Sequence, residues 1–513
     1  MIKHFKNVTR RPSKSDWPKN PSDVPTLFSA RKALRKLRVL VDVELIEVKA
    51  SGGQLDKATV LLALLGSDVV EWYRYTDGLP PTDIQPVDLS PRQPLHPIYA
   101  GWAVAYPLEE SNGYRYRPVV YSTKPEQSYT VGGVRGNMVE LARNDKSQPV
   151  YTELDPEQQA EKREMDMLAL QVADQAVNAD LFITERPYLH SGSTFVSKAG
   201  VTACTLEEAI PLIALYLRAQ REFVLPTGVT AGVPDFRFRF NRGLYYWVGA
   251  RELLPEAWRW FSACVQHASG TGNDKLALLS GSLLSRVAKA LQERDDVHIA
   301  LNLPTNNDTS DEALGCLDNV LVSLMGAVDV AARVAHQVLT LSRGERSAGW
   351  QLEDWLKRVA ARAPALAAVV DPGAPGEHTL TILRLLRNSV HGAALQGVTY
   401  FQDGKAETRI GLPGEEEVKI LSAMDAMGGR GSWGVRSLGS GLSLVQPAVL
   451  VDRLFEEVVK LLNDLIRETP VESLPHVTIT ADNSRPPIDR PPRGNLDTFS
   501  EWNRLAIRWQ LGF

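Results

Sequence analysis

The chain has 513 residues, more than one ordinary hydrophobic core supports, so we expect roughly two to four domains. Hydrophobic residues make up 44% of the sequence and charged residues 23%, which is typical of globular proteins. The formal net charge of −4 excludes a uniformly basic protein that coats nucleic acid. Any contact with RNA must therefore come from local patches or from a cleft in an oligomer.

The first 225 residues predict a basic arm followed by an α/β domain. Residues 1–26 are basic, polar and proline-bearing, as poorly ordered arms are. Residues 27–225 then alternate apolar, β-branched runs with segments of helical spacing, and this alternation indicates an α/β domain. The strands expected there are 37–46, 180–184 and 200–204, and the helices are 57–65, 156–177 and a segment that starts at Thr205.

The rest of the chain predicts a mainly helical part, so the expected fold class is α+β and multidomain. Residues 226–300 form a hairpin and a helical connecting region, the hairpin being predicted from the alternating FRFRFNRGLYYW of Phe236–Trp247. Residues 301–470 form a helical bundle, with helical spacing over 311–341, 351–370 and 380–395, a small β insertion at 399–412 and a long last helix at Val449–Ile466. Residues 471–513 are a proline-rich tail with a short apolar end.

Composition also indicates the compartment. The three cysteines, Cys204, Cys264 and Cys316, lie far apart in the chain, which fits reduced thiols and no disulfide framework. The first 26 residues lack the apolar core of a secretory signal. The longest apolar runs, such as Val60–Leu65, are far shorter than the roughly 20 residues that span a bilayer. We expect a cytoplasmic protein that does not contact membranes.

One helix of the predicted bundle carries a chemically suggestive face. In TLTILRLLRNSVHGAAL, residues 379–395, the apolar side chains fall on one side of a helix. The opposite side carries Arg384, Arg387, Asn388 and His391, at spacings i, i+3, i+4 and i+7. We call these four residues the Arg–His ridge.

The Arg–His ridge has the groups needed for phosphodiester chemistry. An imidazole accepts and donates protons near pH 7, so His391 is a candidate general acid and base. A fixed guanidinium stabilises charge that develops on a phosphate, and Asn388 can orient either group or bind RNA. The same pattern is also found on the solvent-exposed face of an ordinary helix, so the residue types alone leave both interpretations open.

The stretch LRLLRNSVHG, within a bundle that has a β insertion and a long last helix, resembles the HEPN superfamily over roughly residues 305–470. Active members of that family carry an Arg, a polar residue and then a His, and two such motifs meet across a dimer to cleave RNA without a metal. Arg387–Asn388 matches the start of the motif, but only three residues separate Arg387 from His391. Arg384 has the longer spacing but is followed by Leu385, so either arginine remains a candidate.

A second stretch, DMLALQVADQAVNADLFITERPYL (Asp166–Leu189), is similar to the last part of PIN-like nuclease domains. The resemblance implies a metal site made by Asp166 and Glu185, with Asp42 after the LRVLV strand as a third ligand. Clustered carboxylates of this kind hold Mg²⁺ or Mn²⁺ and activate water on a phosphodiester. Acidic residues at helix starts and strand ends are also routine surface features, which is the competing explanation.

We therefore expect a metal-independent endoribonuclease of a bacterial toxin or anti-phage defence type that acts as a homodimer on RNA and needs no cofactor. The defence role, and a partner protein from such a system, follow from the resemblance alone. Two alternatives stay open. One is a non-catalytic HEPN-like dimerisation or scaffold protein in a defence complex, and the other is a metal-dependent PIN-like nuclease.

Overall fold

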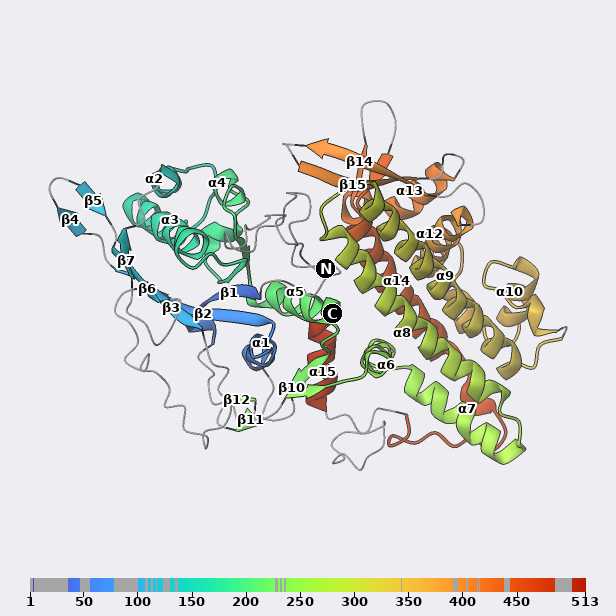
Figure 1. Ribbon diagram of the computed structural model, residues 1–513. Coiled ribbons are helices and arrows are strands. Elements are labelled where there is room, and N and C mark those ends of the chain that lie inside the picture. The colour runs from blue at the N-terminus through green and yellow to red at the C-terminus, as the bar shows by residue number, and fades with distance from the viewer. Residues whose placement is uncertain are drawn as a thin grey trace. The chain divides into compact units, whose positions relative to one another are not determined.

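A computed structural model of the chain divides into two compact units (Figure 1). The α/β unit contains Lys3–Phe240 and Trp509–Gly512, and the helical unit contains Met1–Ile2, Asn241–Arg508 and Phe513. The structure describes residues 3, 36–46, 56–77, 100–106, 109–111, 114–116, 118–122, 130–133, 137–226, 229–230, 233–234, 237–342, 344–390, 395–402, 405–412, 414, 416–437, 443–484 and 501–513.

The α/β unit is built on a seven-stranded mixed sheet with strand order β7-β6-β3-β2-β1-β8-β9. Five neighbouring strands of the sheet are parallel: β3 (Gly101–Ala105), β2 (Val70–Asp77), β1 (Leu37–Asp42), β8 (Leu181–Ile183) and β9 (Thr202–Cys204). Two antiparallel strands, β6 (Pro118–Ser122) and β7 (Thr130–Gly133), extend one edge. Chain order along the parallel part reverses at β1, between β2 and β8. In open α/β sheets such a reversal is where ligands bind, beyond the carboxyl ends of the strands.

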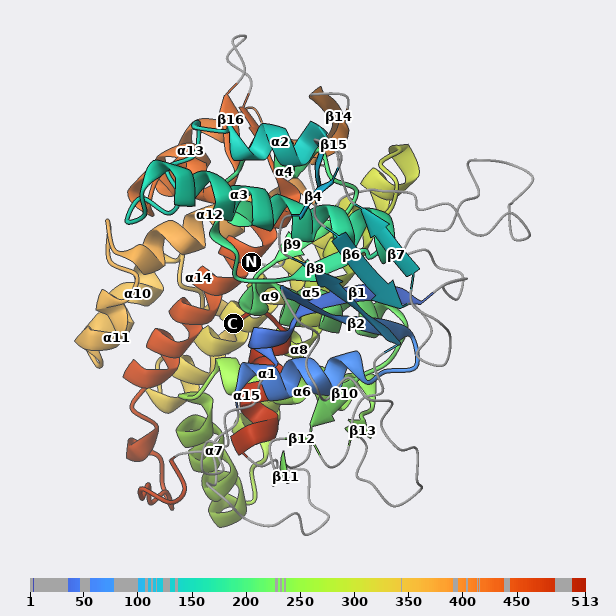
Figure 2. The same ribbon diagram turned by 90° about the vertical axis from the view of Figure 1, so that its left-hand side faces the viewer.

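Helices cover both faces of this sheet, as the parallel strands require because both of their faces are apolar (Figures 1 and 2). The helices of this unit are α1 (Lys57–Leu65), α2 (Asn137–Arg143), α3 (Pro156–Gln171), α4 (Thr194–Ser197) and α5 (Leu206–Ala219). Small two-stranded pairs are β4 (Glu109–Ser111) with β5 (Tyr114–Tyr116), β10 (Val224–Pro226) with β13 (Arg237–Arg239), and β11 (Val229–Thr230) with β12 (Val233–Pro234).

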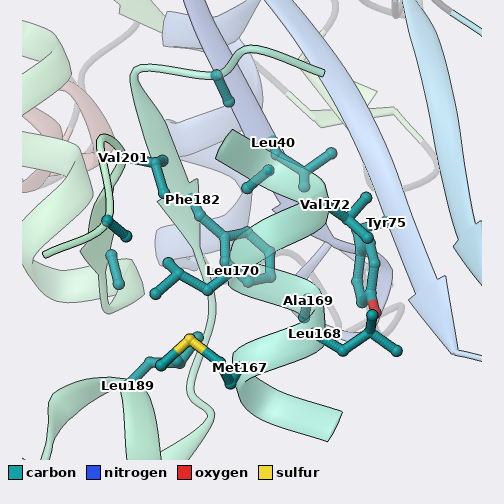
Figure 3. Close-up of a cluster of buried hydrophobic side chains, with 14 of the residues drawn as sticks. Leu40, Tyr75, Met167, Leu168, Ala169, Leu170, Val172, Phe182, Leu189 and Val201 are labelled. Carbon is teal, nitrogen blue, oxygen red and sulfur yellow. The ribbon is translucent and has the colours of Figure 1, made fainter. Parts of the chain in front are cut away.

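The core under α3 is made by alternate residues of the strands. Leu40, Tyr75 and Phe182 point to the same face, where Leu168 of α3 and Val172 of the turn after it pack against them (Figure 3). The rings of Tyr75 and Phe182 meet edge to face, with their centroids 5.6 Å apart. After Gln171, the helix continues as one π turn, Val172–Ala176, which ends before β8. This packing fixes where the next residues of each strand must lie.

The helical unit is a bundle whose long members are α8 (Lys275–Leu301), α9 (Asn307–Val338), α12 (Pro375–Ser389) and α14 (Pro447–Glu468). Shorter helices are α6 (Arg242–Leu253), α7 (Ala257–Thr271), α10 (Glu353–Ala360), α11 (Pro364–Ala368) and α13 (Glu417–Ala426), and the last described helix is α15 (Glu501–Gln510). A four-stranded sheet with order β14-β15-β17-β16 contains β14 (Gln396–Gln402), β15 (Lys405–Gly411), β16 (Val435–Ser437) and β17 (Ser443–Val445).

The predicted α+β fold class is confirmed: the N-terminal half of the chain contains a mixed sheet, and the C-terminal half is mainly helical. The predicted helix start at Thr205 is also present, because its hydroxyl accepts from the Glu208 amide while the Glu208 carboxylate accepts from the Thr205 amide.

Among the described helices, α9 is long and apolar enough to cross a membrane, and half of its most apolar 18-residue stretch is buried inside the structure.

Two local predictions were wrong. The hairpin expected over Phe236–Trp247 is not present. In the described part of this run only Arg237–Arg239 is a strand, and it pairs antiparallel with β10, which precedes it in the chain. The Asn241 side chain caps α6 by accepting hydrogen bonds from the Gly243 and Leu244 amides. The apolar GLYYW run is therefore helical. The α/β unit accordingly runs to Phe240 rather than to 225. The single helix expected over 351–370 is two helices, because Pro364 begins α11.

A buried ionic cluster joins α8 to α14. One Asp452 oxygen lies 2.6 Å from Nε of Arg294 and 2.8 Å from Nε2 of His298, and all three side chains are at most 2% exposed. Burial raises the pKa of Asp452, but Arg294 and His298 outweigh it and hold that pKa well below its usual range. The folded state therefore requires Asp452 as a carboxylate.

We predict that Asp452→Ala costs about 3–5 kcal/mol of unfolding free energy, because it removes the buried carboxylate that contacts both Arg294 and His298. The matched control on the same helix is Asp464→Ala, which removes a half-exposed partner of Arg467 and should cost less than about 1 kcal/mol. Urea denaturation of both variants followed by circular dichroism measures the difference. Equal losses in the two variants would contradict this account of the bundle.

Candidate functional site

The alternation along two neighbouring strands brings aspartates to one edge of the sheet. Leu40 and Tyr75 face α3, so Asp42 and Asp77, two residues later in β1 and β2, project to the same face at the carboxyl ends of these strands. Asp166 comes to this edge from α3, the helix that covers that face. The three carboxylates thus converge although the chain separates them widely.

Arg186, in the turn after β8, binds all three carboxylates. Its Nε lies 2.9 Å from Oδ2 of Asp42, its Nη2 lies 2.8 Å from Oδ2 of Asp77, and its Nη1 lies 3.5 Å from Oδ1 of Asp166. The guanidinium carbon is also 5.3 Å from the centre of the Tyr75 ring. We call Asp42, Asp77, Asp166 and Arg186 the aspartate–arginine cluster.

Further hydrogen bonds fix the cluster. The hydroxyl of Tyr151 donates to Asp166 over 2.5 Å, and the amide of Tyr188 donates to the same oxygen over 3.3 Å. The Thr184 hydroxyl donates to Asp42 over 3.2 Å, and the Tyr75 hydroxyl donates to Asp77 over 2.8 Å. Each aspartate therefore has a neutral donor in addition to the shared guanidinium, so the cluster is firmly positioned.

A cavity of about 830 Å³ opens beside the cluster. Six carboxylates line it against two basic groups, Arg186 and Lys162. The acidic residues are Asp42, Glu44, Asp77, Glu161, Asp166 and Glu185. The cavity therefore carries a negative potential and disfavours an anionic ligand that comes without a cation.

Burial is the main influence on the pKa values of two of these carboxylates, Asp42 and Asp166. Burial raises the pKa of Asp42, Arg186 opposes the rise and the charge of Asp77 adds to it. Burial likewise raises the pKa of Asp166, against the Tyr151 hydrogen bond and the Arg186 charge. One guanidinium is insufficient to compensate three acids in this setting.

The three residues that the PIN-like resemblance implies all line this cavity, but they do not form one cluster. Asp42 and Asp166 belong to the aspartate–arginine cluster, whereas an Oε of Glu185 accepts from the Leu206 amide, 2.8 Å away at the start of α5. In the described part of the chain, no group of three or more His, Cys, Asp or Glu side chains is arranged to hold a metal ion. As they stand these residues do not fit Mg²⁺ or Mn²⁺, because Arg186 lies between the carboxylates.

Arg384, Arg387 and Asn388 of the Arg–His ridge lie on α12. Ile382, Leu385 and Leu386 are buried as the helical spacing predicted, while Arg384 and Asn388 are exposed and Arg387 is half-buried. Arg387 acts electrostatically on Asp329 of the neighbouring helix α9. His391 lies outside the described residues, two positions after the end of α12.

Sequence reasoning missed Asp77, Arg186 and Tyr151. Val70–Asp77 is rich in aromatic residues and ends on an acid, as the LRVLVD strand does, so this second strand could have been found. Arg186 carries no comparable signal, because its role depends on the pairing of β1 with β8. His336 of α9 is a buried bundle histidine: it is 4% exposed and accepts a hydrogen bond from the Trp355 indole.

Comparison with protein-family models, with curated proteins and with solved structures finds no match to this chain.

We predict that Arg186→Met lowers the free energy of unfolding at pH 7 by about 3–5 kcal/mol, because it leaves three facing carboxylates without a cation. The loss should shrink as the pH falls from 7 towards 4. Asp42 and Asp166 have folded-state pKa values above the unfolded ones, so protonation favours the folded state, and that advantage disappears as the pH rises through the folded values.

The control for this prediction is Arg38→Met, which breaks a partly exposed pair with Glu71 and should cost no more than about 1 kcal/mol at any of these pH values. Chemical denaturation across the pH series measures both variants. An Arg186→Met deficit that does not change with pH would mean that the aspartates are not the groups that Arg186 compensates.

Proposed function

We propose that this protein is a metal-independent endoribonuclease of a bacterial toxin or anti-phage defence type, which cleaves RNA in a dimer of its helical unit. The observation that carries the proposal is the Arg–His ridge: two arginines and Asn388 follow one face of α12 immediately before His391. The bundle, its β insertion and the long α14 are the setting in which the HEPN resemblance expects such a ridge. The cytoplasm is the compartment that we propose with it.

The two candidate sites differ in how far their charged groups are already engaged. Each carboxylate of the aspartate–arginine cluster is bound by Arg186, so a metal would have to displace a guanidinium held by three acids. Among the described residues, neither Arg384 nor Arg387 is within ion-pair distance of a carboxylate. Free guanidinium groups beside a histidine favour phosphate chemistry on α12 over metal chemistry at the sheet edge.

In the reaction that we propose, His391 takes the proton from an RNA 2′-hydroxyl. The 2′-oxygen then forms a bond to the adjacent phosphorus, and the bond from phosphorus to the 5′-oxygen breaks. A protonated histidine returns a proton to that leaving oxygen. Arg387 or Arg384 stabilises the charge on the pentavalent phosphorus, and Asn388 orients the substrate.

Asp329 distinguishes the two arginines. Its carboxylate is close enough to Arg387 for their charges to interact, which restricts the guanidinium without neutralising it by a direct ion pair. Arg384 is exposed, and it is not among the arginines whose charge acts on Asp329. Arg387 is therefore the better transition-state ligand, and Arg384 the better candidate for binding substrate.

The α/β unit has a regulatory role in this proposal, or carries a nuclease-like fold without activity. Its acidic cavity lies at the reversal of strand order, where α/β sheets bind ligands. Arg186 neutralises part of that cavity, as a structural counter-ion would.

We predict that the purified protein cleaves tRNA or mRNA in the presence of EDTA and that His391→Ala lowers the rate at least about a hundredfold. Arg387→Ala should reduce the rate more than Arg384→Ala, while Asp42→Asn should leave it within about twofold if it folds. Gel-resolved cleavage measures all four variants beside the wild type.

Two results would overturn this proposal. Cleavage that survives His391→Ala and stops in EDTA would move the chemistry to Asp42 and Asp166. Absence of cleavage by the wild type, also after infected-cell extract is added as a source of activator, would favour the non-catalytic scaffold.

A further inference from the structure

Three helices of the bundle bring arginines around a single carboxylate. Arg286 on α8, Arg333 on α9 and Arg387 on α12 all act electrostatically on Asp329 of α9. Arg333 follows Asp329 by one helical turn, so the two side chains share a ridge of α9. With Arg384 on the same ridge of α12 as Arg387, these four arginines form what we call the arginine surface.

The backbone of α9 gives the position of Arg286. A Cβ atom placed on Gly326 would lie only 2.2 Å from Nη1 of Arg286. The guanidinium therefore rests on the α9 backbone, one turn before Asp329, and a side chain at position 326 would force it away. Glycine at position 326 permits this close approach. The contact places Arg286 beside Asp329 independently of any titration.

The arginine surface carries unbalanced positive charge. Arg286, Arg333 and Arg384 are exposed, and in the described part of the chain none of the four guanidinium groups has an ion pair. Arg286, Arg333 and Arg387 thus act on one half-buried acid, and Arg384 adds a further positive charge on the same ridge of α12 as Arg387. Three other arginines of the helical unit do have ion pairs: Arg453 pairs with Glu457, Arg467 with Asp464 and Arg430 with Asp425. Leaving several guanidinium groups unpaired on one surface favours a polyanionic partner.

The chemistry of that partner follows from the shape and spacing of the donors. A guanidinium binds a phosphate through two parallel hydrogen bonds, and successive phosphates of a nucleic acid suit donors that lie on neighbouring helices. The surface is continuous with Arg387 of the Arg–His ridge, through which a bound strand would pass. A flexible single strand can follow such a path more easily than a rigid duplex.

We propose that the arginine surface binds the phosphate backbone of single-stranded RNA, and that Arg286 and Arg333 hold the strand that the Arg–His ridge cleaves. This inference rests on the proposed function for the identity of the polyanion. Arg286 and Arg333 are binding residues in it, and they take no part in the chemical step.

The test measures binding separately from cleavage. A fluorescein-labelled single strand of about 16 nucleotides with 2′-O-methyl sugars has no hydroxyl that can attack, so it reports binding alone by fluorescence anisotropy. Arg286→Gln/Arg333→Gln should bind it roughly tenfold more weakly at 0.1 M salt. The slope of log Kd against log salt concentration should become shallower by about 1.4, because two phosphate contacts are lost.

Two matched variants complete the experiment. Arg346→Gln/Arg362→Gln removes the same charge from exposed arginines near α10 and α11 and should bind like the wild type. Arg286→Lys/Arg333→Lys keeps both charges and should restore the salt slope, which separates a loss of contact from a loss of folding.

An unchanged affinity and slope in the Gln double variant would overturn the inference, as would an equal loss in the control pair or a wild type that binds only duplex. A wild type that binds the probe through these arginines but fails to cleave unmodified RNA would uphold the arginine surface and refute the proposed ribonuclease.

Discussion

The contact of Arg186 with three aspartates is the constraint on which the α/β unit depends most. It joins the ends of β1 and β2 to α3 and to the turn after β8, so four elements meet at one guanidinium. Two of the acids are almost fully buried, and burial raises their pKa values. The guanidinium of Arg186 is the cation that these three carboxylates share.

The charged residues of the helical unit include a buried, paired cluster and a set of exposed arginines. Inside the bundle, Asp452 is closely bound by Arg294 and His298, which fixes α14 against α8. On the surface, the arginines of α8, α9 and α12 are left without ion pairs among the described residues. Buried charges that are matched serve the fold, whereas exposed charges that are unmatched are available to a ligand. This contrast is the physical basis for assigning the chemistry to the helical unit.

Local signals were sufficient for much of the fold. The apolar spacing of residues 57–65, 311–341 and 449–466 reflects single helices that bury one face, and α1, α9 and α14 follow it closely. The run at 236–247 misled because strand-like side chains there are recruited into α6 by the Asn241 cap. Two of the four residues of the aspartate–arginine cluster could be named from the sequence: Asp42 from its place after the LRVLV strand, and Asp166 from the PIN-like resemblance. Arg186 and Asp77 depend on strand pairing, and Arg286 on a contact with Gly326, which no local pattern encodes.

The chemical nature of the RNA ends tests the central claim most directly. Attack by the 2′-hydroxyl leaves a 2′,3′-cyclic phosphate and a 5′-hydroxyl, whereas attack by metal-activated water leaves a 3′ end without a cyclic phosphate. Mass spectrometry of the products formed in EDTA distinguishes these outcomes. We predict cyclic phosphate ends that disappear in His391→Ala. Products that form only with Mg²⁺ or Mn²⁺ and carry 5′-phosphates would contradict the assignment of catalysis to the helical unit.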